Sequence, residues 1–305
     1  VPRLVVRHST AIELAVTGLA VARRTAGLTI GDTDAEVDAL IASLPASGRG
    51  AFARPLAGAD AAWTTLAGAF AALGDGATAA DASGVIEEMP AADLWRDVLQ
   101  VLAAHTPVDD PAALAEACAA GDRRAREVVA ALSDPDDDRW GPARDELLRL
   151  PPERAKAQLG RALAAVRRVG FTPDREAALA AVLARSAASV EADARLAGDR
   201  ASRAAVEAVI ERATGGVRVD PGAGRVVLAP GLAMRPWNVA AGPDGSVVVY
   251  RVAAEDLGRR GDAPPAALVR LARALADERR LRLLKALAGG PAGLGALAAD
   301  LGVAK

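Results

Sequence analysis

The sequence has few of the residues from which metal centres, disulfides and nucleophilic sites are built. Its 305 residues include one cysteine and two histidines, and aromatic residues make up 3%. One cysteine excludes an internal disulfide and a zinc site made of several cysteines. No apolar run approaches the roughly 20 residues that cross a bilayer, and the N-terminus lacks the basic and apolar regions of a secretion signal. We therefore expect a cytoplasmic protein, with no membrane partner and no cofactor.

The composition is that of a folded globular chain rich in helix. Hydrophobic residues make up 51% and charged residues 25%, with a net charge of -2, and the length suggests about two domains. The 77 alanines favour helix, since alanine is the strongest helix former. Only three of the 37 basic residues are lysines. This bias is typical of a GC-rich genome, so the arginine excess is no evidence for nucleic-acid binding.

The first 213 residues predict a strand followed by a series of helices. Residues 3–8 alternate as a short strand, and residues 11–24 form an amphipathic helix pattern. Ser9 or Thr10 is the expected N-cap of this helix, with Glu13 completing a capping box. Helical spacing recurs over 112–132 and 175–212. Turn signals that divide the helices lie at 44–48, 74–76, 88–90, 106–111, 133–138 and 151–152.

The pattern changes to short alternating segments after residue 214. Residues 217–219, 225–228 and 246–252 are rich in valine, with turn signals at 220–224 and 242–245. We expect a small antiparallel sheet to which residues 3–8 add an edge strand. The predicted fold class is mainly α with a small antiparallel β-sheet (α+β). The predicted domains are 1–213 (helical, regulatory or dimerising), 214–257 (the β segment) and 258–305 (a partial winged helix-turn-helix).

The last 40 residues carry the most informative pattern. Leu268, Leu271 and Leu275 share one face of a first helix, and a second helix follows from Asp277 and stops at 289–291. A third, short helix ends at Gly302. The spacing Ala298-x-x-x-Gly302-Val303 suits a helix-turn-helix, since the small residue permits close approach and glycine accepts the positive φ of the turn.

This stretch resembles the ArsR-like winged helix-turn-helix family of transcriptional regulators. The resemblance lies in residues 271–277, 280–284 and 297–303, and residues 224–230 and 247–250 are similar to the β segment that precedes this module in long members. It implies a homodimeric DNA-binding repressor or activator controlled by an effector. It further implies a dimer seam at Leu268, Leu271 and Leu275. The residues implied for the DNA-binding scaffold are Leu297, Ala298, Gly302, Val303 and Lys305.

Two departures and one charge asymmetry qualify this resemblance. The helix before the turn, 294–299, has none of the cysteines by which metal-sensing members bind their ions, so we expect no metal site there. The recognition helix would begin at about Lys305, where the sequence ends, so we expect this chain alone to bind DNA poorly. Residues 264–305 carry a net charge of +4 and the rest -6, which suits attraction to phosphates as well as it suits a solvated face.

The leading hypothesis is an effector-responsive, dimeric transcriptional regulator whose partner is double-stranded DNA. The alternative is a protein-interaction scaffold or small-molecule-binding module that uses the helix-turn-helix remnant only for packing. An enzyme is disfavoured because no nucleophile–base arrangement is evident. Trp237, between two strand segments, lines a pocket or an inter-domain contact on one hypothesis and packs under the sheet on the other.

Several other features have a plain structural interpretation. Gly48-x-Gly50-x-x-Ala53 and Gly293-x-Gly295-x-x-Ala298 match a dinucleotide-binding fingerprint without its preceding strand, so we expect loops. Residues 134–145 resemble a calcium loop but have arginine where glycine is needed, which indicates a solvated turn. Cys118 is expected to be a small buried residue, and His105 a capping or surface residue. Large aromatic core residues are expected at Trp63, Phe70, Trp95, Trp140 and Phe171.

Overall fold

The computed structural model describes the chain from residue 3 to residue 252, with gaps. The described residues are 3–28, 30, 33–53, 60–104, 110–131, 150–196, 203–214, 225–233, 237–239 and 245–252. The chain divides into two units, Val1–Ala253 and Ala254–Lys305. All described residues belong to the first unit, so the strands near residue 250 share a unit with the helices that precede them.

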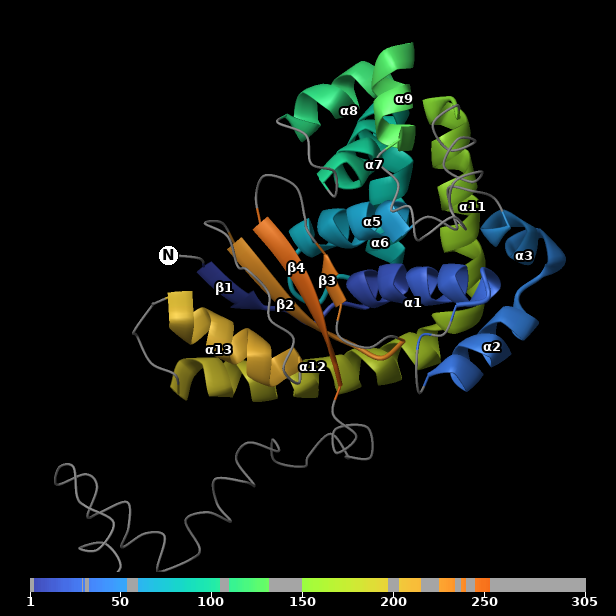
Figure 1. Cartoon of the computed structure of the whole chain (residues 1–305). Coiled ribbons are helices and arrows are strands. Elements are labelled where there is room, and N and C mark those ends of the chain that lie inside the picture. Colours follow the sequence, from blue (N-terminus) through green and yellow to red (C-terminus); the bar gives the residue numbers. More distant parts are fainter. Residues whose placement is uncertain are drawn as a thin grey trace, which may run out of the picture. The chain divides into compact units, whose positions relative to one another are not determined.

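Helices dominate this first unit (Figure 1). In chain order they are α1 (Thr10–Thr25), α2 (Asp34–Ser43), α3 (Ala46–Phe52), α5 (Asp60–Ala72), α6 (Ala79–Glu88), α7 (Ala91–Ala104), α8 (Pro111–Ala119), α9 (Arg123–Ala131), α11 (Pro152–Gly170), α12 (Pro173–Leu196) and α13 (Arg203–Thr214). The predicted turns at 44–48, 74–76, 88–90 and 151–152 coincide with or adjoin helix ends. The region 112–132 holds two helices, because Gly121 takes a φ of 90° between them.

Helix α1 is the centre of the unit and differs from its expected amphipathic form. Every residue from Thr10 to Ala22 is buried, because α5, α2, α6 and α11 pack around it together with the sheet. Small residues make this close packing feasible. A Cβ on Gly18 would lie 2.1 Å from Cζ3 of Trp63, so the indole rests directly on the helix backbone.

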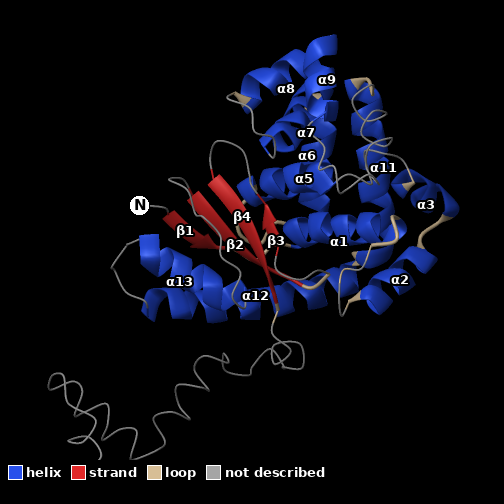
Figure 2. Cartoon of the chain, viewed as in Figure 1, coloured by secondary structure: helices blue, strands red, loops and turns tan. Residues whose placement is uncertain are grey.

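Within the described residues, the sheet has four strands in the order β1-β2-β4-β3 (Figure 2). The strands are β1 (Arg3–Val6), β2 (Arg225–Gly231), β3 (Trp237–Val239) and β4 (Gly245–Arg251). β1 pairs with β2 and β2 with β4, both in parallel, whereas β3 pairs antiparallel with β4. The chain therefore passes from β2 to the far edge, forms β3, and returns as β4 between them.

The predicted antiparallel sheet is thus wrong in strand direction, although the sheet, its size and the α+β class are as predicted. Strand direction depends on how long connections cross the molecule, and local alternation carries no such information. The edge position of β1 agrees with the prediction. Trp237 was expected in a loop between strands, but it begins β3 and pairs with Val249 of β4.

Helices cover both faces of the sheet (Figure 1). Val227, Ala229, Val247 and Val249 point into the main core, which also holds α1 and α5. Their neighbours in the strands point the other way and form a second cluster with α12 and α13, made of Val206, Val209, Ile210, Val226, Leu228, Val248 and Tyr250. β2 and β4 are buried on both faces, which explains their nearly continuous apolar sequences.

Candidate functional site

Three parallel strands end at the same edge of the sheet, and several polar side chains gather just beyond them. β1 ends at Val6, β2 at Gly231 and β4 at Arg251. The chain then continues into the loop before α1, into the segment of Leu232 and Ala233, and into Val252. In sheets of this kind, ligands bind outside the carboxyl ends of the strands. This edge is therefore the candidate functional site.

Glu13 of α1 reaches this edge from the core. Its side chain accepts hydrogen bonds from the backbone N–H of Leu232, at 3.1 Å to each carboxylate oxygen, and from that of Ala233, at 3.0 Å to Oε1. Glu13 is 2% exposed. We call this arrangement of Glu13 with the two backbone N–H groups the Glu13 clamp. It fixes the first two residues after β2 to the central helix.

Burial sets the proton affinity of Glu13. Loss of hydration raises the pKa of its carboxyl from 4.5 to about 7, although the N–H groups of Leu232 and Ala233 act in the opposite direction. Desolvation disfavours the charged form, whereas hydrogen bonds to the carboxylate favour it. Among the described residues, the causes of this shift in pKa are burial and the two backbone N–H groups. Near neutral pH, Glu13 therefore exists in both protonation states inside the core.

The amino end of α1 is held by a second carboxylate. Ser9 is the N-cap and accepts from the N–H of Ile12. The Thr10 hydroxyl donates to Oε1 of Glu176 in α12 at 2.6 Å, and the same oxygen accepts from the N–H of Ala79 at 2.7 Å. Glu176 thus joins the first turns of α1 and α6, where negative charge is favoured by the helix dipoles.

His8 and Asp75 form an exposed pair beside this end of α1. Nδ1 of His8 lies 2.8 Å from Oδ1 of Asp75, which also accepts from the His8 backbone N–H. The side chains are 31% and 59% exposed. Asp75 lies between Gly74 and Gly76, whose φ angles of 112° and 74° allow the turn to bring it there. The pair ties the β1–α1 loop to the α5–α6 turn.

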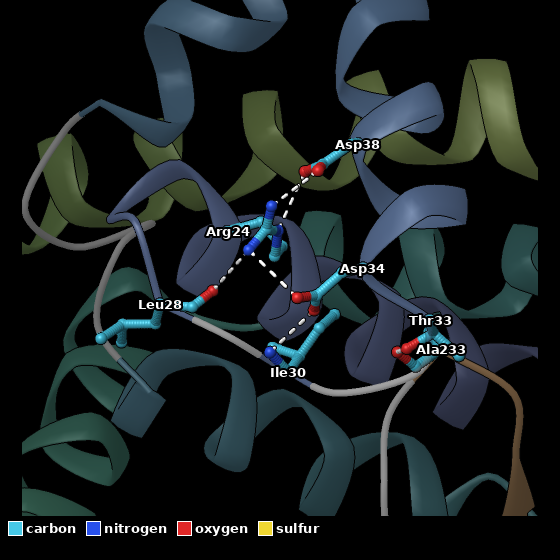
Figure 3. A network of polar contacts seen from close by, with 7 residues as sticks. All are labelled: Arg24, Leu28, Ile30, Thr33, Asp34, Asp38 and Ala233. Atoms are coloured by element: carbon cyan, nitrogen blue, oxygen red, sulfur yellow. Dashed lines mark hydrogen bonds and ion pairs between the residues drawn. The ribbon is translucent and has the colours of Figure 1, made fainter.

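Polar contacts join the carboxyl end of α1 to the start of α2, and a further bond joins the residue before α2 to Ala233 (Figure 3). Arg24 pairs with Asp34 and Asp38 of α2, which lowers the pKa of Asp38, and it also donates to the carbonyl of Leu28. Asp34 accepts from the N–H of Ile30. Thr33, directly before α2, donates its hydroxyl to the carbonyl of Ala233 at 2.9 Å. Ala233 is therefore hydrogen-bonded through its N–H to Glu13 and through its carbonyl to Thr33.

At this edge, a buried carboxyl group whose pKa is raised to about 7 holds a backbone segment through hydrogen bonds. Within the described ranges, no group of three histidine, cysteine or acidic side chains is placed to hold a metal ion. No helix in the same part of the chain is long and apolar enough to cross a membrane.

Cys118 is buried, as predicted, and burial raises the pKa of its thiol, which disfavours a reactive thiolate.

Most of the site residues expected from sequence lie outside the described residues. These are the seam residues Leu268, Leu271 and Leu275, and the scaffold residues Leu297, Ala298, Gly302, Val303 and Lys305. The calcium-like stretch 134–145, Trp140, His105 and the second glycine fingerprint also lie there. Trp237 is placed only through its backbone in β3. Both hypotheses for its side chain stay open.

The remaining motifs lie within the described residues. Trp63, Phe70, Trp95 and Phe171 are buried, as predicted. The first glycine fingerprint was expected to be a loop, but Gly48 and Gly50 lie inside α3, where Gly48 packs against Ala165 of α11. Because α3 follows α2 and not a strand, the arrangement lacks the strand–turn–helix of a dinucleotide site.

Sequence reasoning assigned Glu13 to a capping box, and the structure corrects this. With Ser9 as N-cap, the third helical position is Ile12, so Glu13 is one residue too far to return to the cap. A signal for its role was present in the sequence. Glu13 is the one charged residue between Thr10 and Ala22, and an isolated charge in a long apolar helix indicates a buried polar contact.

No protein-family model, curated protein or solved structure matches the chain.

Proposed function

We propose that this chain belongs to an effector-responsive transcriptional regulator that acts as a homodimer on double-stranded DNA. In this proposal, residues 258–305 supply the helix-turn-helix, and the preceding unit senses the effector and contributes to the dimer. The observation that carries the proposal is the pattern of Leu297, Ala298, Gly302 and Val303, with small, apolar and turn-forming residues at helix-turn-helix spacing.

Two further observations support this proposal. The pattern lies outside the unit that holds the described helices and sheet, in the second of the two units into which the chain divides, Ala254–Lys305. That region has an excess of basic residues over acidic ones, whereas the rest of the chain has an excess of acidic ones. The opposite charges favour approach of the reader rather than the body to phosphates.

In this proposal, the first unit regulates the affinity for DNA. An effector shifts DNA affinity only to the extent that it binds one state of the protein more tightly than another. The carboxyl edge of the sheet is our candidate for this response, because it joins the central helix to the strand from which the chain leaves for the second unit. By the family resemblance, Leu268, Leu271 and Leu275 form the seam between subunits.

A binding titration on DNA tests the proposal. The full-length gene product is titrated against the duplex upstream of its own gene and against a shuffled duplex of equal length, at a fixed salt concentration of about 100 mM, because such affinities depend steeply on salt. We expect the upstream duplex to bind more tightly. Gly302→Val should weaken this binding by about tenfold or more, since a β-branched residue is strained at the positive φ that the turn requires.

Gly50→Val is the matched control. Gly50 lies in α3, and a side chain there would meet nothing within 4 Å, so affinity should stay unchanged. Equal affinity for both duplexes, or equal affinity of the Gly302→Val variant and the wild type, contradicts the proposed function and favours the scaffold alternative. Far-UV circular dichroism of both variants checks that they keep the helical content of the wild type.

A further inference from the structure

One hydrogen bond connects the segment held by the Glu13 clamp to the residue at which the chain leaves β4. Leu232 and Ala233, which Glu13 holds, directly follow Gly231. The carbonyl of Gly231 accepts from the N–H of Val252 at 3.1 Å. Val252 is the first residue after β4, and the second unit begins at Ala254. The contacts therefore run without interruption from the buried helix α1 to the chain segment that enters the second unit.

Close packing makes this junction sensitive to movement. A Cβ on Gly231 would lie 2.6 Å from Cγ1 of Val249 and 3.2 Å from Oε2 of Glu13. β2, β4 and the Glu13 side chain therefore meet at a position where only glycine fits. Thr33 holds Ala233 from the side of α2. Leu232 and Ala233 are therefore joined directly to a closely packed residue whose carbonyl holds Val252.

We propose that the Glu13 clamp is a proton-dependent latch. The protonation state of Glu13 controls whether Leu232 and Ala233 stay bonded to α1, and this in turn affects the position at which the chain leaves β4 for the second unit. The coupling to DNA rests on the proposed function, whereas the latch itself does not. In the closed state, Glu13 is buried and bonded to Leu232 and Ala233. In the open state, the segment has moved away and the carboxylate is hydrated.

Proton linkage gives the direction of the effect. The closed state has a raised pKa, about 7 against 4.5 for a hydrated glutamate, so protons stabilise the closed state. The stabilisation is complete below pH 4.5 and is lost as the pH rises through 7. Between about pH 6 and pH 8, the population of the open state should increase about tenfold. Above that range the increase levels off, because Glu13 is ionised in both states.

The other charged side chains near α1 form ion pairs or hydrogen bonds with groups other than Glu13, or lie at a distance from the Glu13 clamp. Around α1, the charged or titratable side chains that are not fully exposed belong to Arg7, His8, Arg23, Arg24, Asp34, Asp60, Lys156, Glu176, Arg185 and Arg225. Five of them take part in ion pairs, His8 with Asp75, Arg23 with Asp60 and Arg24 with Asp34.

The rest of this set bond to other groups or lie at a distance from the clamp. Arg7 donates to the carbonyl of Ala71, and Lys156 donates to the carbonyls of Glu87 and Met89. Glu176 accepts from Thr10 and Ala79, and Arg225 lies at the opposite end of β2. The pKa of Glu13 is set by its burial and by the N–H groups of Leu232 and Ala233.

Amide hydrogen exchange of the full-length protein tests the latch. Protection factors of the Leu232, Ala233 and Val252 amides, corrected for the intrinsic pH dependence of exchange, are measured at about pH 6 and pH 8. We expect all three to fall together, by about tenfold, in the wild type. In Glu13→Gln, which cannot ionise, they should be equal at the two pH values. A pH-independent wild type, or an unchanged response in the variant, overturns the proposal.

Glu176→Gln is the matched control. Glu176 also accepts a backbone N–H, that of Ala79 in α6, and it lies beside the same first turn of α1 as Glu13, but its hydrogen bonds do not involve the residues after β2. The variant should keep the wild-type response at Leu232 and Val252. The wild-type pH series needs no substitution, so it decides the question even if Glu13→Gln folds poorly.

DNA binding separates the latch from the proposed function. If the latch couples to the second unit, the affinity for the upstream duplex changes between the two pH values in the wild type but not in Glu13→Gln. An exchange response without a change in affinity overturns the coupling. Absence of duplex binding at both pH values contradicts the proposed function instead, and the exchange response then still decides whether the latch exists.

Discussion

Gly18 allows the indole of Trp63 to lie against the backbone of α1. Because a Cβ at this position would come within 2.1 Å of the ring, we expect Gly18→Ala to force α1 and α5 apart. Overpacking of this kind costs about 1–3 kcal/mol, which outweighs the gain of under about 1 kcal/mol from alanine in a helix. The free energy of unfolding, measured with urea, should fall by about 2 kcal/mol.

Gly84→Ala is the matched control for this prediction. Gly84 also lies within a helix, α6, but a Cβ there would meet nothing within 4 Å. The substitution should raise the free energy of unfolding by about 0.5–1 kcal/mol, since only the helix propensity changes. If Gly18→Ala were equally stabilising, the close packing of Trp63 on α1 would be contradicted.

For single residues, the sequence indicates burial more readily than it indicates hydrogen-bond partners. Trp63, Phe70 and Cys118 were predicted to be buried, because size and apolarity suffice for that inference. The partners of Glu13 were not predictable. They are two backbone N–H groups, 219 and 220 positions along the chain, and neither side-chain identity nor local spacing marks a backbone donor.

Among the elements, β2 and β4 depend on the close approach at Gly231. A Cβ on Gly231 would overlap Cγ1 of Val249 at 2.6 Å. We therefore expect Gly231→Ala to separate the ends of the two strands and to lower the free energy of unfolding by about 1–3 kcal/mol. The amide of Val252, which is bonded to the Gly231 carbonyl, should become less protected from exchange at the same time.

Gly160→Ala in α11 is the control for this strand contact. A Cβ at Gly160 would meet Cγ2 of Ile86 at 3.8 Å, an ordinary contact distance. The variant should be as stable as the wild type or slightly more so, and Val252 should stay protected. Equal stability of the Gly231→Ala variant would show that the strand ends are not closely packed.

Element types and approximate bounds followed from the sequence, whereas strand direction did not. The alanine-rich segments and their turn signals predicted the helices, and the valine-rich segments predicted β2 and β4. The continuous apolar character of β2 and β4 is itself a signal of burial on two faces, which is typical of parallel strands. The position of β3 beyond β4 follows from the path of the whole chain, which no local pattern encodes.

At the scale of the whole molecule, the charge distribution makes a prediction about DNA binding. If Lys305 neutralises one phosphate, Lys305→Ala should weaken duplex binding and make the slope of log K against log salt shallower by about 0.9. Arg123→Ala is the control, because this side chain is 91% exposed in the body and pairs only locally, with Glu127. It should leave the slope unchanged. Equal slopes for both variants would exclude a phosphate interaction at Lys305.

The order of the strands also constrains how the protein is made. β1, at the N-terminus, pairs with β2, and the register joins Arg3 to Arg225. At ribosomal speeds of about 5–20 residues per second, roughly 10–40 s pass between the synthesis of β1 and the synthesis of β2. During synthesis, α1 has no sheet to rest on, and its apolar surface must be shielded by the helices that emerge next or by a chaperone. The helices between β1 and β2 can therefore pack before the sheet forms, because β2 and β4 are made after them.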